Sequence, residues 1–209
     1  PTSGTEIEVS WTTITGLTYK LEHSADGTTW GTEADPATTP YTDSGLAEGS
    51  THYYRAYAVN PSGTSAVSSA VSATTFDNPT QPLNLILTPT ITDLLEVTLT
   101  WSPPSDDGGT TITNYVIHRS VDSGFLTYDI LQAQGGTETT RSYVDGTLTI
   151  GTTYYYRVQA ENSVDVSDWS ATVSYTSPTL PDAPTGLTAT PYSTQNTQIK
   201  LAWNAPANS

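Results

Sequence analysis

The sequence predicts an all-β protein built from tandem two-layer sandwiches, and two observations carry that prediction. Three short segments alternate apolar and polar residues with a period of two, which is the pattern of a strand that turns one face into a core. Each of the three ends in tryptophan: residues 7–11 (IEVSW), 97–101 (VTLTW) and 199–203 (IKLAW). Larger blocks around these segments recur at a constant spacing, which indicates a repeated unit.

The repeated unit measures 102 residues. Three pairs of equivalent residues are separated by that distance: Trp101 and Trp203, Pro82 and Pro184, and Leu46 and Leu148. Trp11 and Trp101 are only 90 residues apart, because the middle repeat carries 12 extra residues. Six of them enlarge the loop at 102–114, and six fall between residues 115 and 148. Surface loops tolerate such insertions, so the strands keep their spacing.

The composition suits strands better than helices. Hydrophobic residues make up 35% of the 209 and charged residues only 13%, and the remainder is rich in threonine. The branched side chain of threonine fits a pleated, half-buried surface. The chain has no cysteine, which excludes disulfides, thiolate metal sites and cysteine nucleophiles.

The charge balance excludes two classes of partner. Six Lys and Arg residues stand against 21 Asp and Glu residues, which gives a net charge of −15. Nucleic-acid binding needs a stripe of clustered basic residues, and anionic membranes attract basic segments for the same reason. We therefore expect no nucleic acid and no membrane among the partners.

The repeated blocks resemble fibronectin type III repeats over essentially the whole chain. Residues 79–89, which begin and end in proline, resemble the first strand of that family, and residues 97–101 resemble its second strand. Residues 115–117 resemble the third strand. Residues 148–158 (LTIGTTYYYRV) resemble the turn and strand that carry the tyrosine corner. The resemblance implies tandem immunoglobulin-like β-sandwiches.

The resemblance also implies a set of structural residues. Trp11, Trp101 and Trp203 are expected in the cores of their repeats. Tyr154 is expected to be the corner tyrosine, whose ring packs while its hydroxyl bonds to nearby backbone. The first repeat has His52 at the equivalent position. An imidazole can hydrogen-bond there but reaches less far, so we expect a weaker or rearranged corner.

The repeats divide the chain into three predicted domains. Residues 1–76 form a repeat that lacks its first strand, residues 77–178 a complete repeat, and residues 179–209 the first two strands of a third. The junctions at 74–82 and 177–184 are short and contain proline, which stiffens a linker. We expect a semi-rigid rod. Since the sequence begins with Pro1 and has no methionine, we also expect it to be part of a longer protein.

The components of known catalytic and cofactor sites are missing from the sequence. His23, His52 and His118 form no H-x-x-x-H or comparable pair, and His23 and His118 belong to equivalent strands of different repeats. The motifs G-x-S-x-G, G-x-x-x-x-G-K-[ST] and G-x-G-x-x-G do not occur. We expect structural histidines, no catalytic residue, no cofactor and no enzyme activity in this chain.

One acidic cluster is a weak candidate for a metal site. Asp106 and Asp107 lie in the enlarged loop and are followed by two glycines. Clustered carboxylates suit Ca²⁺, but the spacing of an EF-hand is absent. Asp and Gly both favour turns, so the sequence predicts a turn here, with a calcium site as the alternative.

Four aromatic residues are candidates for binding a ligand. Trp30 and Trp169 have no counterpart in the other repeat, and Tyr53 and Tyr155 are expected to face outward from their strands. Exposed rings stack on sugars or anchor partners, but outward aromatic side chains also stabilise sheets. We expect ordinary packing for the two tryptophans, with Trp169 stacked on Arg157 as a cation–π pair, and a ligand role as the alternative.

These observations predict a structural spacer that arranges or projects other domains of a large extracellular, cell-surface or virion protein. The repeats look most like those of prokaryotic surface proteins and phage tail or capsid-associated proteins. The expected partners are other domains of the same protein or of a larger assembly. Two alternatives stay open: an adhesion module that binds a host glycan or protein, and an accessory module of a secreted polysaccharide-degrading enzyme.

Overall fold

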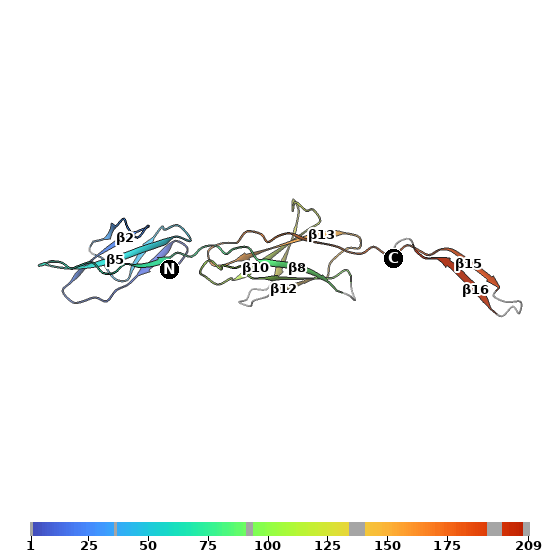
Figure 1. The fold of residues 1–209 in the computed structure, drawn as a ribbon, viewed down its shortest axis with the longest axis horizontal. Helices are drawn as coiled ribbons and strands as arrows, with labels where there is room; N and C mark the ends of the chain where they lie inside the picture. The colour runs from blue at the N-terminus through green and yellow to red at the C-terminus, as the bar shows by residue number, and fades with distance from the viewer. Residues whose placement is uncertain (1, 36, 91–93, 134–140, 192–197, 207–209) are drawn as a thin grey trace.

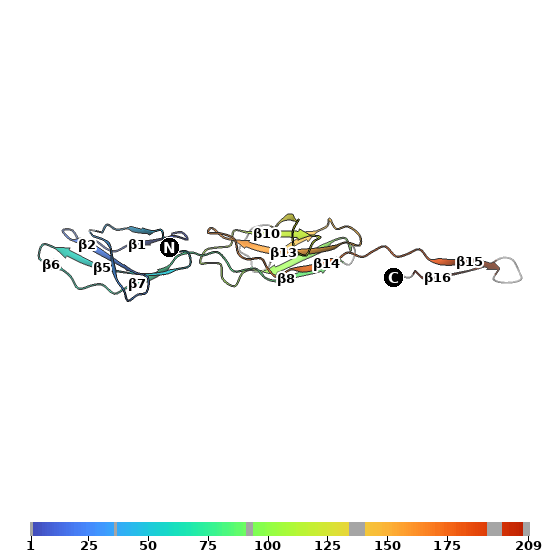
Figure 2. The ribbon, with the colours of Figure 1, turned by 90° about the horizontal axis from the view of Figure 1, so that it is seen from above.

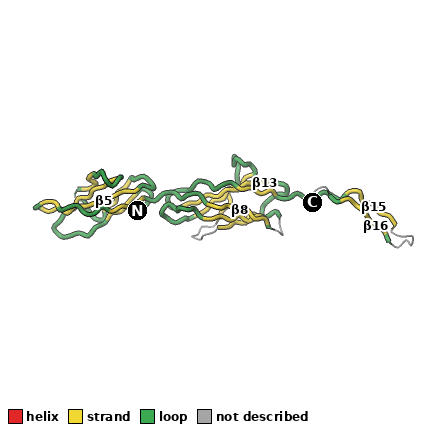
Figure 3. The backbone as a smooth tube through the Cα atoms, in the orientation of Figure 1, coloured by secondary structure: helices red, strands yellow, loops and turns green. Residues whose placement is uncertain are grey.

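Every regular element in the described part of the chain is a β-strand (Figure 3). The computed structural model describes residues 2–35, 37–90, 94–133, 141–191 and 198–206. The strands form three units that follow one another along the longest axis of the molecule (Figure 1). Among these residues there is no helix of the length and apolarity that crossing a membrane requires.

The second repeat is a sandwich of two antiparallel sheets with a shared core. Part of its second insertion, residues 134–140, lies outside the described residues. One sheet has the strand order β12-β9-β8, formed by β8 (Leu83–Pro89), β9 (Val97–Ser102) and β12 (Arg141–Asp145). The other has the order β11-β10-β13-β14, formed by β10 (Asn114–Ser120), β11 (Asp129–Ala133), β13 (Thr153–Glu161) and β14 (Val173–Thr176).

Burial in the second repeat follows the period-two pattern of its sequence. Buried and half-buried residues alternate along all of β9 and all of β13, because successive side chains of a strand point to opposite faces. Trp101 is only 1% exposed, and its ring meets the Tyr115 ring edge-on at a centroid distance of 5.5 Å. That geometry is favoured between aromatic rings.

The first repeat has the same arrangement with one strand fewer in its smaller sheet. That sheet is the pair β1 (Glu6–Val9) and β4 (Tyr41–Ser44). The larger sheet is formed by β2 (Thr18–Ser24), β3 (Gly31–Ala34), β5 (Thr51–Asn60), β6 (Gly63–Thr64) and β7 (Val71–Thr74). The buried core is correspondingly smaller: Ile7, Leu21, Ala37 and Tyr54.

Trp11 departs from the predicted pattern, because it lies beyond the end of β1 and is only half-buried. Beyond the end of the strand, the Thr39 side chain binds the Trp11 backbone. Its hydroxyl oxygen accepts from the Trp11 backbone N–H at 3.1 Å, and the hydroxyl donates to the Trp11 carbonyl at 3.3 Å. The indole still packs against the core of the first repeat, 5.9 Å from the Tyr19 ring centroid.

The core position predicted for Trp203 is wrong for this chain, since 59% of the residue is exposed. The third unit is a two-stranded antiparallel hairpin of β15 (Thr185–Pro191) and β16 (Ile199–Asn204), and every residue of both strands is exposed. A sheet buries its apolar face only against a second layer. The described residues supply no second layer here, so the indole stays in solvent.

Candidate functional site: the junction between the first two repeats

The linker that leads from β7 into β8 is bound on both sides. On the side of the first repeat, the Gly49 N–H donates to the Phe76 carbonyl at 3.1 Å. On the side of the second repeat, the enlarged loop takes part. The Asp77 N–H donates to the Gly108 carbonyl at 2.8 Å, and the Thr80 N–H donates to the Asp106 carbonyl at 3.0 Å. The insertion in the second repeat therefore holds the linker.

Asn162 joins three pieces of backbone at this junction. It is 5% exposed and directly follows β13. Its side-chain nitrogen donates to the carbonyls of Asp77 at 2.7 Å and Asp107 at 2.8 Å. Its side-chain oxygen accepts from the N–H groups of Val164 at 2.8 Å and Asp165 at 3.1 Å. The amide thus uses both donors and both lone pairs.

Glycine is required at position 108 by the same contact. Gly108 has φ +75°, a left-handed conformation that glycine adopts without steric cost. A Cβ atom at this position would lie 2.0 Å from the Asp77 carbonyl oxygen. Since that oxygen belongs to the backbone, any side chain here would displace the linker.

The two repeats also contact each other directly. A Cβ atom at Gly4, in the first repeat, would lie 3.0 Å from Val164 Cγ1 in the second, so the two surfaces are in close contact. Asn78, in the linker, donates from its side chain to the Val166 carbonyl at 3.3 Å. The junction is therefore built from a linker, a loop and two packed ends.

Asp106 and Asp107 form the turn that the sequence predicts. The Asp106 carboxylate accepts from the Gly108 N–H, and the Asp107 carboxylate accepts from the Gly109 N–H, each at 2.9 Å. Both aspartates are exposed. The calcium alternative stays a prediction.

The aromatic candidates lie in different repeats. Trp30 is half-buried and lies 4.0 Å from Arg55, and Trp169 is half-buried and lies 4.3 Å from Arg157, each distance measured from the ring centroid to the guanidinium carbon. The two arginines are equivalent residues of the two repeats. In each repeat a tryptophan covers this arginine, but the two tryptophans come from different loops. Tyr53 and Tyr155 are half-buried on their strands.

The tyrosine corner takes two forms. In the second repeat the Thr149 N–H donates to the Tyr154 hydroxyl at 3.2 Å. In the first repeat the His52 Nε2 atom lies 2.7 Å from Ser50 Oγ, and the serine hydroxyl donates to the Ala47 carbonyl. Ala47 is the residue equivalent to Thr149. The serine hydroxyl therefore spans the distance that the shorter imidazole leaves.

A buried tyrosine–aspartate bond, which sequence reasoning missed, recurs in both repeats. The Tyr54 hydroxyl donates to Asp43 at 2.7 Å, and the Tyr156 hydroxyl donates to Asp145 at 2.9 Å. Arg119 also binds Asp145, at 3.0 Å. The signal in the sequence was the spacing of 11 residues between aspartate and tyrosine, which is the same in both repeats.

Sequence reasoning also missed a pair of histidines in the first repeat. His23 Nε2 lies 2.8 Å from His52 Nδ1, although the two residues are 29 positions apart. Burial lowers the pKa of His52, and the neighbouring His23 lowers it further. Glu33 and Asp43 lie beside the pair. The hydrogen bond from Tyr41 to Glu33 raises the pKa of Tyr41 to about 12.

Comparison with known proteins identifies the fold of the second repeat. The family model described as "Fibronectin type III domain" matches residues 80–176. Through this domain the chain belongs to the fibronectin type III family. The 102-residue spacing and the shared tyrosine–aspartate bond extend the same sandwich to the first repeat, so the protein is a tandem of fibronectin type III sandwiches.

Several longer proteins are similar to most of the chain. Exoglucanase B of Cellulomonas fimi is 30% identical over 220 residues, which cover 97% of this chain and 18% of that protein. Fibronectin type-III domain-containing protein 3A of Mus musculus is 25% identical over 197 residues, 91% of this chain and 16% of that protein. The chain thus spans less than a fifth of either relative. A crystal structure of chicken CNTN1 FN1-FN3 domains aligns at 18% identity with a TM-score of 0.43, over 84% of this chain and 64% of that one.

The relatives define a module rather than an activity. One is named as an enzyme and the other for the domain that it shares with this chain. A fold that serves such different proteins fixes no function by itself. Fibronectin type III domains are structural or accessory modules, typically without catalysis.

Proposed function

We propose that this chain is a spacer whose junctions fix the direction from one sandwich to the next. The observation that carries the proposal is the fully bonded Asn162 amide, which ties the linker to the enlarged loop. Such a bond network orders the linker at a cost in conformational entropy, and a fixed orientation of the neighbouring domains is what that order provides. The units lie end to end in both views (Figures 1 and 2).

The second junction repeats one contact of the first. The Gly151 N–H donates to the Pro178 carbonyl at 3.2 Å, as the Gly49 N–H donates to the Phe76 carbonyl. Both residues of the later pair lie 102 positions after their counterparts. A contact that recurs at each exit from a sandwich supports a rod whose joints share this bond.

The setting of the spacer is part of the same proposal. An acidic surface keeps a protein soluble and resists self-association, which suits an exposed extracellular, cell-surface or virion protein. Its partners would be other domains of the same protein or of a larger assembly. The similarity to Exoglucanase B over nearly the whole chain supports an extracellular setting.

Breaking the Asn162 amide should loosen the junction without unfolding either repeat. Asn162→Ala removes both bonds to the linker and loop, and each such bond contributes roughly 0.5–1.5 kcal/mol. The absence of cysteine allows two spin labels, at Ser72→Cys on β7 and Val144→Cys on β12, both exposed. We expect a narrow distribution of distances between the labels in the parent chain and a broader one in the variant.

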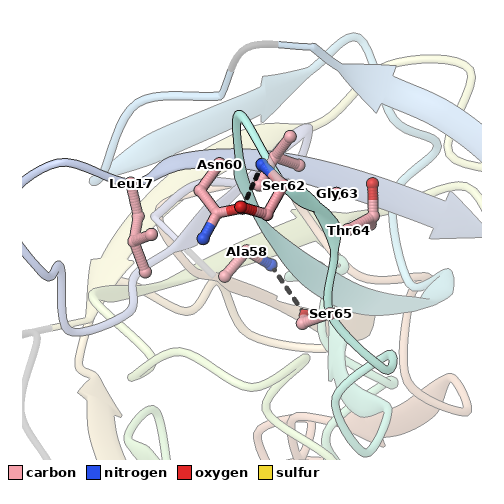
Figure 4. A pocket seen from close by; sticks show the side chains of 8 residues that line it. Leu17, Ala58, Asn60, Ser62, Gly63, Thr64 and Ser65 are labelled. Carbon is pink, nitrogen blue, oxygen red and sulfur yellow. Dashed lines mark hydrogen bonds between the residues drawn. The ribbon is translucent and has the colours of Figure 1, made fainter.

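Asn60→Ala is the matched control. Asn60 is the equivalent residue of the first repeat, and its side-chain oxygen accepts from the Ser62 N–H at 2.8 Å (Figure 4). It therefore shares with Asn162 the bond to the N–H two residues further on, but it lies far from the linker. The control should leave the distances unchanged. An equally broad distribution in the parent chain and in Asn162→Ala would refute the spacer with fixed joints.

The similarity to Exoglucanase B favours one second candidate, an accessory module that binds a glucan. Trp30 is the candidate residue, because it is half-buried and stacks on Arg55 in a loop of the first repeat. Sedimentation with insoluble cellulose is the direct measurement. Binding by the parent chain that Trp30→Ala abolishes would support this function, and a parent chain that stays in the supernatant would exclude it for cellulose.

A further inference from the structure

Side chains from four strands meet at the end of the first sandwich nearest the second repeat. His23 lies on β2, Glu33 on β3, Asp43 on β4 and His52 on β5. The first three each offer one ligand atom, and these atoms all lie within 4.8 Å of one another. Because β4 belongs to the smaller sheet and the other strands to the larger, the cluster bridges the two layers of the sandwich.

A chain of hydrogen bonds determines which nitrogen of His23 is free. Ser50 donates its only hydroxyl proton to the Ala47 carbonyl, so its oxygen must accept from His52 Nε2–H. The neutral His52 then carries its lone pair on Nδ1, which can only accept from His23 Nε2–H. The lone pair of the neutral His23 is therefore on Nδ1.

That lone pair faces negative charge. His23 Nδ1 lies 3.9 Å from Glu33 Oε2, and the Asp43 carboxylate completes the group. Within the described part of the chain, no lysine or arginine approaches either carboxylate within ion-pairing distance. A lone pair and two carboxylates that converge on one point form an arrangement that a cation would stabilise.

In the second repeat, an arginine side chain supplies the positive charge at the position of His23. His23 pairs with Tyr54 across the strands as Arg119 pairs with Tyr156, so His23 and Arg119 are equivalent. The Arg119 guanidinium binds Asp145 at 3.0 Å and Asp129 at 2.6 Å. The first repeat keeps one of these carboxylates, as Asp43, and has a shorter imidazole in place of the arginine. Its second carboxylate is Glu33, which is not the counterpart of Asp129, because Asp129 pairs with Arg119 whereas His23 pairs with Gly31.

Both carboxylates are held by tyrosine hydroxyls that leave one oxygen free. Tyr41 donates to Glu33 Oε1 at 2.8 Å, which leaves Oε2 facing His23. Tyr54 donates to Asp43 Oδ2 at 2.7 Å, which leaves Oδ1. Outer hydrogen bonds of this kind orient the ligands of metal sites.

The strand register also directs Glu33 to this place. Leu21 pairs with Ala34 but Glu22 pairs with Thr32, so Glu33 is an extra residue in β3. Such a shift bends a strand and re-aims a side chain. The corresponding pairing of β10 with β11 in the second repeat is regular.

We propose that His23 Nδ1, Glu33 Oε2 and the Asp43 carboxylate bind one zinc-class divalent cation that links the two sheets of the first repeat. Imidazole with carboxylate oxygens is a donor set that suits Zn²⁺. Three protein ligands leave a fourth position for water. The cation takes the place of the guanidinium that holds the second repeat, and His52 and Ser50 fix the tautomer of the ligating imidazole.

Zinc titration of metal-free 209-residue protein tests the proposal. Isothermal calorimetry should give one site, and Zn²⁺ should raise the unfolding temperature of the first repeat reversibly, with the effect removed by EDTA and not reproduced by Mg²⁺. Glu33→Gln and His23→Gln should abolish the site. Tyr41→Phe, which removes only the outer bond to Glu33, should weaken binding by about 10–100-fold.

His118→Gln is the matched control, because His118 is a buried histidine of the second repeat and should leave zinc binding unchanged. Imidazole ¹⁵N NMR supplies a readout that does not depend on stability. Zinc should shift His23 Nδ1 and leave His52 protonated on Nε2. A proton on both His23 nitrogens at neutral pH, unaffected by zinc, would overturn the proposal, as would a parent chain that binds no zinc at micromolar concentrations.

Discussion

Replacing Trp101 with alanine should cost the second repeat about 3–5 kcal/mol of its free energy of unfolding, the usual loss for a buried tryptophan. The indole is almost fully buried between the two sheets and packs against Tyr115. A domain of this size has a total stability of only about 5–15 kcal/mol, so the variant should be close to unfolding. Hydrogen exchange across β9 and β13, followed by mass spectrometry, measures the loss in this repeat alone.

Trp203→Ala is the matched control for this experiment. The two tryptophans occupy equivalent positions, 102 residues apart, but Trp203 is exposed on the hairpin. Removing an exposed side chain changes stability by about 0.5 kcal/mol or less. Equal losses in the two variants, or a loss below about 1 kcal/mol for Trp101→Ala, would contradict the core described above.

The contrast between these tryptophans shows how far a local pattern predicts burial. Alternation over five residues predicts a strand and the face that is apolar, because both depend on neighbouring residues. Burial of that face depends on a second layer, which is distant in the sequence. The pattern of residues 199–203 is as regular as that of residues 97–101, yet Trp203 is exposed in this chain.

The junction could be predicted only in part. The proline content of the linker and the turn at Asp106 and Asp107 are local properties, and the structure places a turn there. That this turn holds the linker depends on the distance between Gly108 and the Asp77 carbonyl. No pattern within either segment encodes that contact, although the insertion at 102–114 marked the loop as unusual.

The His23 cluster could not have been predicted from motif spacing. Metal motifs are recognised when ligands lie on one strand or helix at fixed intervals, whereas these ligands come from separate strands. The extra residue at Glu33 adds a shift in register that alternation alone does not reveal. Alignment of the two repeats does place His23 at the position of Arg119, which was the available signal.

Asp145→Asn should destabilise the second repeat by about 3–5 kcal/mol, because it removes one partner of a buried ion pair. The Asp145 side chain is almost fully buried, binds Arg119 at 3.0 Å and accepts from the Tyr156 hydroxyl at 2.9 Å. The substitution leaves Arg119 with the largely exposed Asp129 and the Thr147 hydroxyl. Asp129→Asn is the control, since Asp129 is largely exposed and exposed ion pairs contribute about 0–1 kcal/mol.

The same aspartate should determine how the second repeat responds to acid. Burial alone would raise the pKa of Asp145, but hydrogen bonds from Thr147 and Tyr156 and the charge of Arg119 outweigh it and lower the pKa. The folded state therefore binds fewer protons than the unfolded state, and stability rises with pH in this window. The contribution is complete above the unfolded pKa of about 3.9 and is lost as the pH falls through the lower, folded-state pKa.

Urea titrations at a series of pH values, followed by the NMR signals of β10 and β13, measure this dependence. The parent chain should lose stability in the second repeat as the pH falls below about 4, whereas Asp145→Asn should start from a lower stability and change less over the same range. This result would show that the Asp145 carboxylate stabilises the buried Arg119 guanidinium only while the carboxylate is ionised, because Arg119 stays charged over the whole pH range. If both proteins lost the same free energy between neutral pH and acid, the Arg119–Asp145 pair would not be the acid-sensitive element of this sandwich.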